Sequence, residues 1–292
     1  MMPNIQKEKA DLFLKYHHDE EILVLLNSWD VGSSRLIEAS GYKAIATTSM
    51  GIAASLGYPD CQVIQLSEMI HAITGIVNGV QVPVTVDLEA GYGSNTDEIV
   101  DSVAKVIATG IVGINIEDSI ALSPRLIDEM EFCERISAIR GLADSLGLHL
   151  VINARTDSFY TSSGSLPEKL SESIRRGNKY REAGADCIFV QPVCERETIA
   201  TLVKEIHAPI NILANPGIGA GMPPSLRELQ DLGVARVSLG SGLMKATLAL
   251  IKKVADELSE KGTYNALLDA MTPLPDAAMA YKMAIGLRSA GD

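Results

Sequence analysis

The stretch PVTVDLE at residues 83–89 is a short β-branched apolar run that ends in two carboxylates. The same pattern, apolar residues followed by polar ones, recurs at GINIED (113–118) and LVINART (150–156). Five further apolar runs have similar lengths: ILVLLN (22–27), AIATTS (44–49), CIFVQPV (187–193), INILAN (210–215) and RVSLG (236–240). Continuous apolar runs separated by helix-like segments are typical of parallel strands that helices cover. Eight of them predict an α/β fold, a (β/α)8 or TIM barrel.

Glycines support the same repeat. Gly41, Gly110, Gly147, Gly184 and Gly233 each stand three residues before one of the predicted strands. Glycine after the last turn of a helix adopts the left-handed conformation that ends the helix. We therefore expect each of these glycines to close a helix just before the chain re-enters the barrel.

The chain of 292 residues, 47% of them hydrophobic, is expected to form one domain over residues 1–292. Barrels of this class commonly have about 250 residues. After the last predicted strand, segments 242–261 and 265–288 look helical, which is one helix more than a minimal barrel needs. The helices from about residue 242 are therefore expected to take part in oligomerisation.

Charge and composition exclude several classes of partner. The net charge of -12 disfavours binding to nucleic acid or to an anionic membrane surface. No apolar run reaches the roughly 18 residues of a membrane span, and MMPNIQKEKADLF lacks the apolar stretch of a signal peptide. The four cysteines show no paired ligand spacing such as C-x-x-C. We expect a cytoplasmic protein with reduced cysteines.

Chemistry is expected where the strands end, because the active sites of such barrels lie at the carboxyl ends of their strands. Asp87 and Glu89 end one predicted strand, Glu117 ends the next, and Arg155 ends the one after that. Carboxylates gathered at one place repel unless a cation lies between them, and oxygen ligands without His or Cys select magnesium, or manganese. The alternative is that these acids cap helices or pair with Arg155.

Two further features concern anionic groups of a substrate. The planar guanidinium of Arg155 can bind a carboxylate or phosphonate at two points, although a structural ion pair is the alternative. Glycine-containing loops at 217–221 and 240–242 follow the last two strands, where many barrels bind phosphate. Glycine at these positions is equally typical of a mobile turn.

Taken together, the motifs resemble those of the isocitrate lyase and phosphoenolpyruvate mutase superfamily over residues 22–245. The matching segments are NSWDVGSS (27–34), TSM (48–50) through GYPD (57–60), VDLEAGYG (86–93), INIED (114–118) and NARTD (153–157). The resemblance implies a homotetramer that exchanges a C-terminal helix. It also implies a magnesium-bound 2-oxo acid substrate.

Site residues follow from the same resemblance. It implies Asp87 as a direct metal ligand, with Glu89, Glu117 and Asp60 acting at the metal mainly through water. Ser49 and Met50 would offer backbone N–H groups to an enolate oxygen, and Arg155 would support the substrate. Arg155, Asp60 and Ser49 are thus the expected catalytic residues. The expected substrate-binding residues are Thr48, Ser49, Met50, Arg155, Asn211 and Gln191.

The departures from the family's patterns shape the functional prediction. The segment SIALSPRL (119–126) matches neither the K-[KR]-C-G-H segment of lyases nor the P-K-x-N-S segment of mutases, and Gln191 replaces an acid or base. We expect a magnesium-dependent carbon–carbon lyase or decarboxylase that acts on a small 2-oxo or 2-hydroxy acid through an enolate. The alternatives are phosphorus–carbon chemistry on a phosphonopyruvate-like substrate and an oxo-acid binding protein that has lost catalysis.

Overall fold

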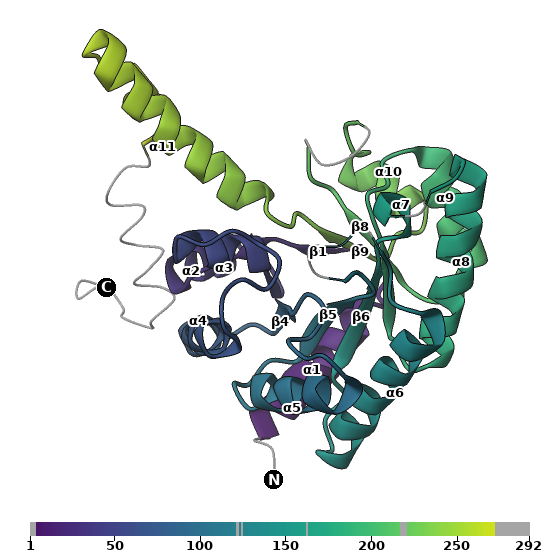
Figure 1. The fold of residues 1–292 in the computed structure, drawn as a ribbon. Coiled ribbons are helices and arrows are strands. Elements are labelled where there is room, and N and C mark those ends of the chain that lie inside the picture. Colours follow the sequence, from purple (N-terminus) through teal and green to yellow (C-terminus); the bar gives the residue numbers. More distant parts are fainter. Residues whose placement is uncertain (1–3, 121–122, 124, 162, 217–220, 272–292) are drawn as a thin grey trace.

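Figure 1 shows the computed structural model, which describes residues 4–120, 123, 125–161, 163–216 and 221–271. Every strand pairing in its sheet is parallel. The strands are β1 (Leu23–Leu25), β2 (Asn27–Ser28), β3 (Ile45–Thr47), β4 (Val84–Asp87), β5 (Gly113–Glu117), β6 (Val151–Thr156), β7 (Cys187–Val190), β8 (Ile210–Leu213) and β9 (Arg236–Ser238). All but β2 lie within one of the eight predicted apolar runs, and β2 extends one residue beyond the run 22–27.

The first predicted strand is split in two, and the split closes the sheet. β1 pairs with β9, whereas β2 pairs with β3, and only Leu26 separates β1 from β2. The sheet order is β1-β9-β8-β7-β6-β5-β4-β3-β2, so the first and last strands of the sheet are separated by a single residue of the chain. The two outer strands are joined covalently, and the predicted (β/α)8 barrel is confirmed.

Helices surround the barrel and connect its strands (Figure 1). They are α1 (Asn4–Tyr16), α2 (Val31–Ala39), α3 (Ser49–Ser55), α4 (Leu66–Gly79), α5 (Thr96–Ile107), α6 (Glu129–Ser145), α7 (Ser158–Thr161), α8 (Leu166–Glu182), α9 (Arg196–Glu205), α10 (Leu226–Asp231), α11 (Gly242–Lys261) and α12 (Asn265–Ala270). The five glycines predicted to end helices all have φ between +64° and +114°. The predicted helix 265–288 is wrong in its extent, because α12 ends at Ala270 and Met271 is extended, and residues 272–288 lie outside the described residues.

Helix α1, which the sequence patterns did not single out, packs at the amino ends of the strands. Phe13 is fully buried, and a Cβ on Gly113, the first residue of β5, would lie 2.8 Å from its ring. The guanidinium of Arg236 lies 5.9 Å from the centre of the Phe13 ring, and Nη1 of Arg236 faces Nε2 of His17 at 3.4 Å. Glycine at 113 thus makes room for an aromatic ring at this end of the barrel.

Helix α11 leaves the barrel mouth and extends away from the body of the molecule (Figure 1). Only Met244 is buried within it, so most of its length is not packed against the barrel. Among the helices of the described residues, none combines the length and apolar composition that a bilayer crossing requires.

Candidate functional site

A cavity of about 210 Å³ lies at the carboxyl ends of the barrel strands. Its walls come from strand ends all around the barrel and from the loops that follow them. The lining residues are Asn27, Thr48, Ser49, Met50, Asp60, Asp87, Asn115, Arg155, Tyr160, Phe189, Gln191, Leu213, Ser238, Gly240, Ser241 and Lys245. The volume suits a small molecule, since pockets for drug-sized ligands start at about 300 Å³.

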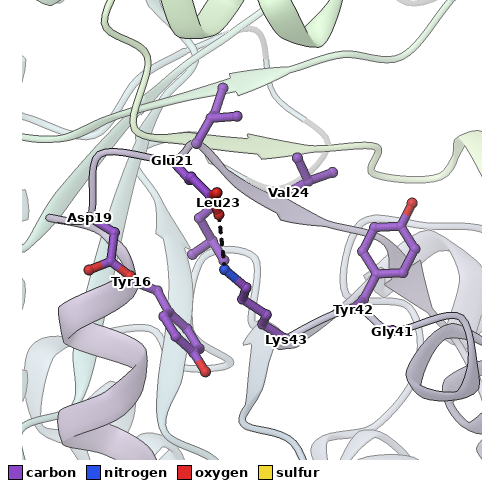
Figure 2. A pocket seen from close by; sticks show the side chains of 9 residues that line it. Tyr16, Asp19, Glu21, Leu23, Val24, Gly41, Tyr42 and Lys43 are labelled. Carbon is purple, nitrogen blue, oxygen red and sulfur yellow. Dashed lines mark hydrogen bonds and ion pairs between the residues drawn. The ribbon is translucent and has the colours of Figure 1, made fainter.

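A second cavity, of about 180 Å³, lies at the opposite end of the strands (Figure 2). Leu23 begins β1 and Lys43 lies two residues before β3, so this cavity is at the amino ends of these strands. Lys43 pairs with Glu21 at 3.1 Å, and both side chains are more than half exposed. Residues at the amino ends of barrel strands usually contribute to stability, whereas active sites lie at the carboxyl ends. The first cavity is therefore the candidate functional site.

Residues 48–51 comprise the N-cap and the first turn of α3, directly after β3. Thr48 is the N-cap of α3, and its hydroxyl accepts a hydrogen bond from the Gly51 N–H. A Cβ at position 51 would lie 2.5 Å from the Thr48 methyl group and 2.9 Å from Cβ of Trp29, so only glycine fits. The turn brings Ser49 against Asp87, whose Oδ2 accepts from the Ser49 hydroxyl at 3.0 Å and from its N–H at 3.4 Å.

Four carboxylates, Asp60, Asp87, Glu89 and Glu117, make up what we call the acidic cluster. Burial raises the pKa of Asp60, and the charge of Asp87 raises it further. One oxygen of this side chain, Oδ1, is buried and has no hydrogen-bond partner among the described residues. A buried carboxylate oxygen without a donor indicates a site that a cation or water would complete.

Glu89 is held in an unusual conformation at the end of β4. Its φ is +52°, in the left-handed region that non-glycine residues rarely adopt. Its side chain is bound by the Gln62 N–H at 2.9 Å and by the Tyr92 hydroxyl at 3.4 Å. Burial, followed by the nearby charges of Asp87 and Asp60, raises the pKa of Glu89 to about 8. The protein thus places a carboxylate where it is costly to ionise.

Arg155 is the cation next to the acidic cluster, and its guanidinium is already engaged. Nε and Nη2 each contact an oxygen of Asp157 at 2.7 Å, and Nη1 lies 2.6 Å from Oε2 of Glu117. Ser119 donates to the other oxygen of Glu117. Burial raises the pKa of Glu117 to about 7, although the Arg155 charge opposes that shift. The structure thus brings the predicted substrate cation and a predicted metal ligand into one ion pair.

The donor set can be tested against a metal ion. Among the residues that the structure describes, no three Asp, Glu, His or Cys side chains lie close enough together to enclose one ion. Within the same residues, Asp87 accepts side-chain hydrogen bonds only at Oδ2. The side chains are oxygen donors only, and magnesium usually keeps several waters. An oxygen-only donor set of this kind fits a hard cation that keeps most of its waters.

Other predicted residues lie around this centre. The Gln191 carboxamide lines the cavity and lies within hydrogen-bonding distance of the Arg155 guanidinium. Asn211 is fully buried below the cavity and reaches it only through Ser238, to which it donates at 3.3 Å. Its role in substrate binding stays a prediction, as do the roles of the other site residues.

Several lining residues were not predicted. The oxygen of Asn115 accepts from Asn153 at 2.8 Å and from the Arg236 guanidinium at 3.0 Å. A guanidinium only donates, so this assignment is unambiguous and the Asn115 amide nitrogen is the atom left for the cavity. Lys245, in α11, and Tyr160, in α7, also line the site. Asn115 stood within a quoted motif, whereas nothing in the sequence pattern pointed to Lys245.

Comparison with known proteins gives matches over most of the chain. A family model described as phosphoenolpyruvate phosphomutase matches residues 13–259. An uncharacterized protein of Mycobacterium tuberculosis is 34% identical, over 85% of this chain and 89% of the relative. The 2-methylisocitrate lyase of Escherichia coli is 27% identical, over 86% and 85%. A solved structure from Burkholderia cenocepacia, provisionally described as a lyase/mutase, has a TM-score of 0.86 at 30% identity, over 95% and 96%.

Proposed function

The chain belongs to the phosphoenolpyruvate phosphomutase family, in the PEP mutase/isocitrate lyase superfamily of lyases and mutases, and from it we propose a magnesium-dependent carbon–carbon lyase or decarboxylase. Its substrate is a small 2-oxo or 2-hydroxy dicarboxylic acid, and the reaction passes through an enolate. The observation that carries the proposal is that Asp60 and Asp87 of the acidic cluster line one cavity with Ser49 and Arg155, while Glu117 pairs with Arg155.

The residues around the acidic cluster support enolate chemistry. Cleavage of a bond beside a carbonyl leaves negative charge on the carbonyl oxygen, and fixed donors stabilise such charge as it develops. Ser49 and Met50 begin α3 and line the cavity, and the Ser49 hydroxyl and N–H both donate to the Asp87 carboxylate. The proposed role of the Ser49 and Met50 N–H groups is to donate to the enolate oxygen when the substrate is bound. A bound Mg²⁺ would supply Lewis-acid stabilisation of the same charge.

Decarboxylation of an oxaloacetate-like acid makes the fewest demands on this cavity. Bond cleavage then releases CO2 and needs no base to begin it. The described lining contains no His or Cys, and Gln191 cannot act as an acid or a base at neutral pH. The Tyr160 hydroxyl also lines the cavity, and its proposed role is to return a proton to the product enolate.

The direct test is pyruvate release from oxaloacetate. We expect release well above the enzyme-free rate with Mg²⁺, and a fall to that rate when EDTA removes the metal. Coupled reduction of pyruvate by lactate dehydrogenase measures the reaction. A panel of 2-oxo and 2-hydroxy diacids extends the assay, and tight binding of these acids without turnover of any of them would identify a binding protein instead.

Phosphorus–carbon chemistry is the second candidate, favoured by the family match and by the cation Lys245 at the cavity wall. The same protein preparation is incubated with 3-phosphonopyruvate and Mg²⁺. Phosphorus NMR then distinguishes the two candidates, because a mutase or hydrolase converts the phosphonate resonance into a phosphate ester or inorganic phosphate.

Stability should fall with pH in the absence of metal. Glu89 and Glu117 have pKa values raised from 4.5 to about 8 and about 7, so the folded state keeps protons that the unfolded chain has lost. Stability falls with pH wherever the folded state binds more protons. We expect the free energy of unfolding in EDTA to decrease between about pH 7.5 and about 8.5, above most of the titration of unfolded histidines near pH 6.5.

Urea denaturation at the two pH values measures this effect. Adding Mg²⁺ should restore stability at the higher pH, because the metal binds the ionised carboxylates. Glu89→Gln removes one of the titrating groups and should flatten the dependence. Equal stability at both pH values in EDTA would contradict the proposed environment of the acidic cluster.

We also propose that the protein is a homotetramer assembled through its C-terminal helices. Leu248, Ile251 and Leu258 lie on α11 with spacings of three and seven residues and are 44%, 61% and 42% exposed. Apolar residues at such spacing form one helix face, which a second copy would cover. Ile251→Asp should give a smaller species in light scattering after gel filtration, whereas Ala249→Asp, at an exposed position on the opposite side of the same helix, should not. A monomeric unmodified protein would contradict the assembly.

A further inference from the structure

The amino end of α11 opens onto the cavity and is not capped by a side chain. Ser241, its N-cap residue, makes no side-chain capping bond, and the first turn of this 20-residue helix contains no acidic residue. The first N–H groups of a helix have no partner within the helix, and the helix dipole makes this end positive. An anion would therefore be stabilised here, although a helix end alone does not identify a site.

Ser241 supplies an independent indication. It is only 7% exposed, yet it lines the cavity, and its hydroxyl has no hydrogen-bond partner among the described residues. A hydroxyl that lines a cavity and has no protein partner can donate to a molecule bound there. Ser238 is the last residue of β9, three residues before Ser241, and it also lines the cavity. Its hydroxyl accepts a hydrogen bond from Asn211, so its own proton remains available to the cavity. Two hydroxyl donors thus face the same side of the cavity.

Lys245 adds a positive charge on the same helix face. It lies four residues after Ser241, which places the two side chains on neighbouring turns, and both line the cavity. Within the described part of the chain, Lys245 forms no ion pair. Arg155, the other cation of the lining, is bound at two points by Asp157 and also by Glu117. A second anionic group of a substrate would therefore find Lys245 available and Arg155 occupied.

These donors stand apart from the acidic cluster. Strand β9 leads into α11, and β4 carries Asp87. Around the closed barrel, β4 lies three strand positions from β9, because the split strand β1/β2 and then β3 come between them. The cavity is thus lined by carboxylates on one wall and by hydroxyl groups, a helix amino end and an ammonium group on another. Such polarity fits a molecule with a metal-binding 2-oxo acid end and a second anionic end.

We propose that Ser241, Lys245 and the first turn of α11 form a subsite for the second anionic group of the substrate, a carboxylate of a small diacid. The subsite rests on the proposed function for the other end of the substrate, where the 2-oxo acid group is bound. It determines specificity by selecting diacids over monoacids, because only a diacid places charge against Lys245 while its oxo acid end lies at Asp87.

Calorimetric binding with Mg²⁺ tests the subsite. The ligands are pyruvate, which has one carboxylate, and malate and 2-oxoglutarate, which have two. Lys245→Met and Ser241→Ala should each weaken diacid binding by about tenfold, as expected for a lost charge-assisted hydrogen bond, and should change pyruvate binding by less than about twofold. Lys252→Met is the matched control, since Lys252 is on the same helix and pairs with Asp256.

The outcomes separate this inference from the proposed function. Equal weakening of pyruvate and diacids, or no change in either, would overturn the subsite. If the unmodified protein binds no pyruvate, the proposed function fails, and succinate, which has two carboxylates and no oxo group, then decides the subsite. Succinate binding that Lys245→Met abolishes would uphold it, and absence of that binding would overturn it. Binding of 3-phosphonopyruvate that depends more strongly on Lys245 would identify the second group as a phosphonyl.

Discussion

Replacing Asp87 by Asn is expected to reduce kcat/KM for oxo-acid cleavage by about 10³-fold or more. Asp87 ends β4, lines the cavity and is held by the Ser49 hydroxyl at 3.0 Å. Lewis-acid stabilisation of developing charge is worth several kcal/mol, and each 1.36 kcal/mol corresponds to about tenfold in rate. The substitution keeps the size of the side chain but removes the charged oxygen of the proposed direct ligand.

The variant should also lose binding of Mg²⁺ while remaining folded. In EDTA its stability should equal or exceed that of the unmodified protein, because one charge of the acidic cluster is gone. Thermal unfolding with and without Mg²⁺ measures both properties. Asp97→Asn, an exposed acid in the first turn of α5, serves as the control and should leave activity and metal response unchanged. An unchanged kcat/KM in Asp87→Asn would refute the assignment.

Replacing Arg155 by Met is expected to lower the free energy of unfolding by about 3 kcal/mol or more. The change removes the partner of two carboxylates whose side chains are only 13% and 7% exposed, Glu117 and Asp157. Removing one member of a buried ion pair leaves an uncompensated charge, which typically costs about 3 to 5 kcal/mol. Activity should fall too, but here the loss of activity accompanies a loss of stability, unlike in Asp87→Asn.

Urea denaturation with a matched surface variant tests this prediction. Arg175 is half exposed and pairs with Glu129 and Glu172, so Arg175→Met should cost less than about 1 kcal/mol. The Arg155 charge lowers the pKa of Glu117, so without it this carboxylate binds its proton more tightly in the folded state, and the destabilisation should be larger at pH 8 than at pH 6.5. Adding Asp157→Asn to Arg155→Met should recover part of the loss. Equal effects of the two arginine variants would contradict the buried pairing.

Local patterns in the chain predicted the candidate site only in part. Asp87 and Arg155 were expected at the mouth because each ends a predicted strand, and all parallel strands of a barrel end on the same side, whereas Ser49 was expected only from the family resemblance. The structure places all three in one cavity. Strand position, however, does not specify which group a long side chain contacts, and Arg155 reaches Asp157 and Glu117.

By itself, the sequence determined the barrel and the order of its polar strand ends. Apolar runs and helix-ending glycines are local features, and both depend on the conformations that short segments prefer. Only the tertiary structure decided how deeply the carboxylates of the acidic cluster are buried and which charges surround them. Glu89 and Glu117 acquire raised pKa values because other segments bury them beside like charges. Lys245 meets the cavity because the closed sheet brings the start of α11 to the mouth that β4 also reaches. The raised pKa values and the position of Lys245 both depend on distances across the barrel, which the spacing of residues along the chain does not specify.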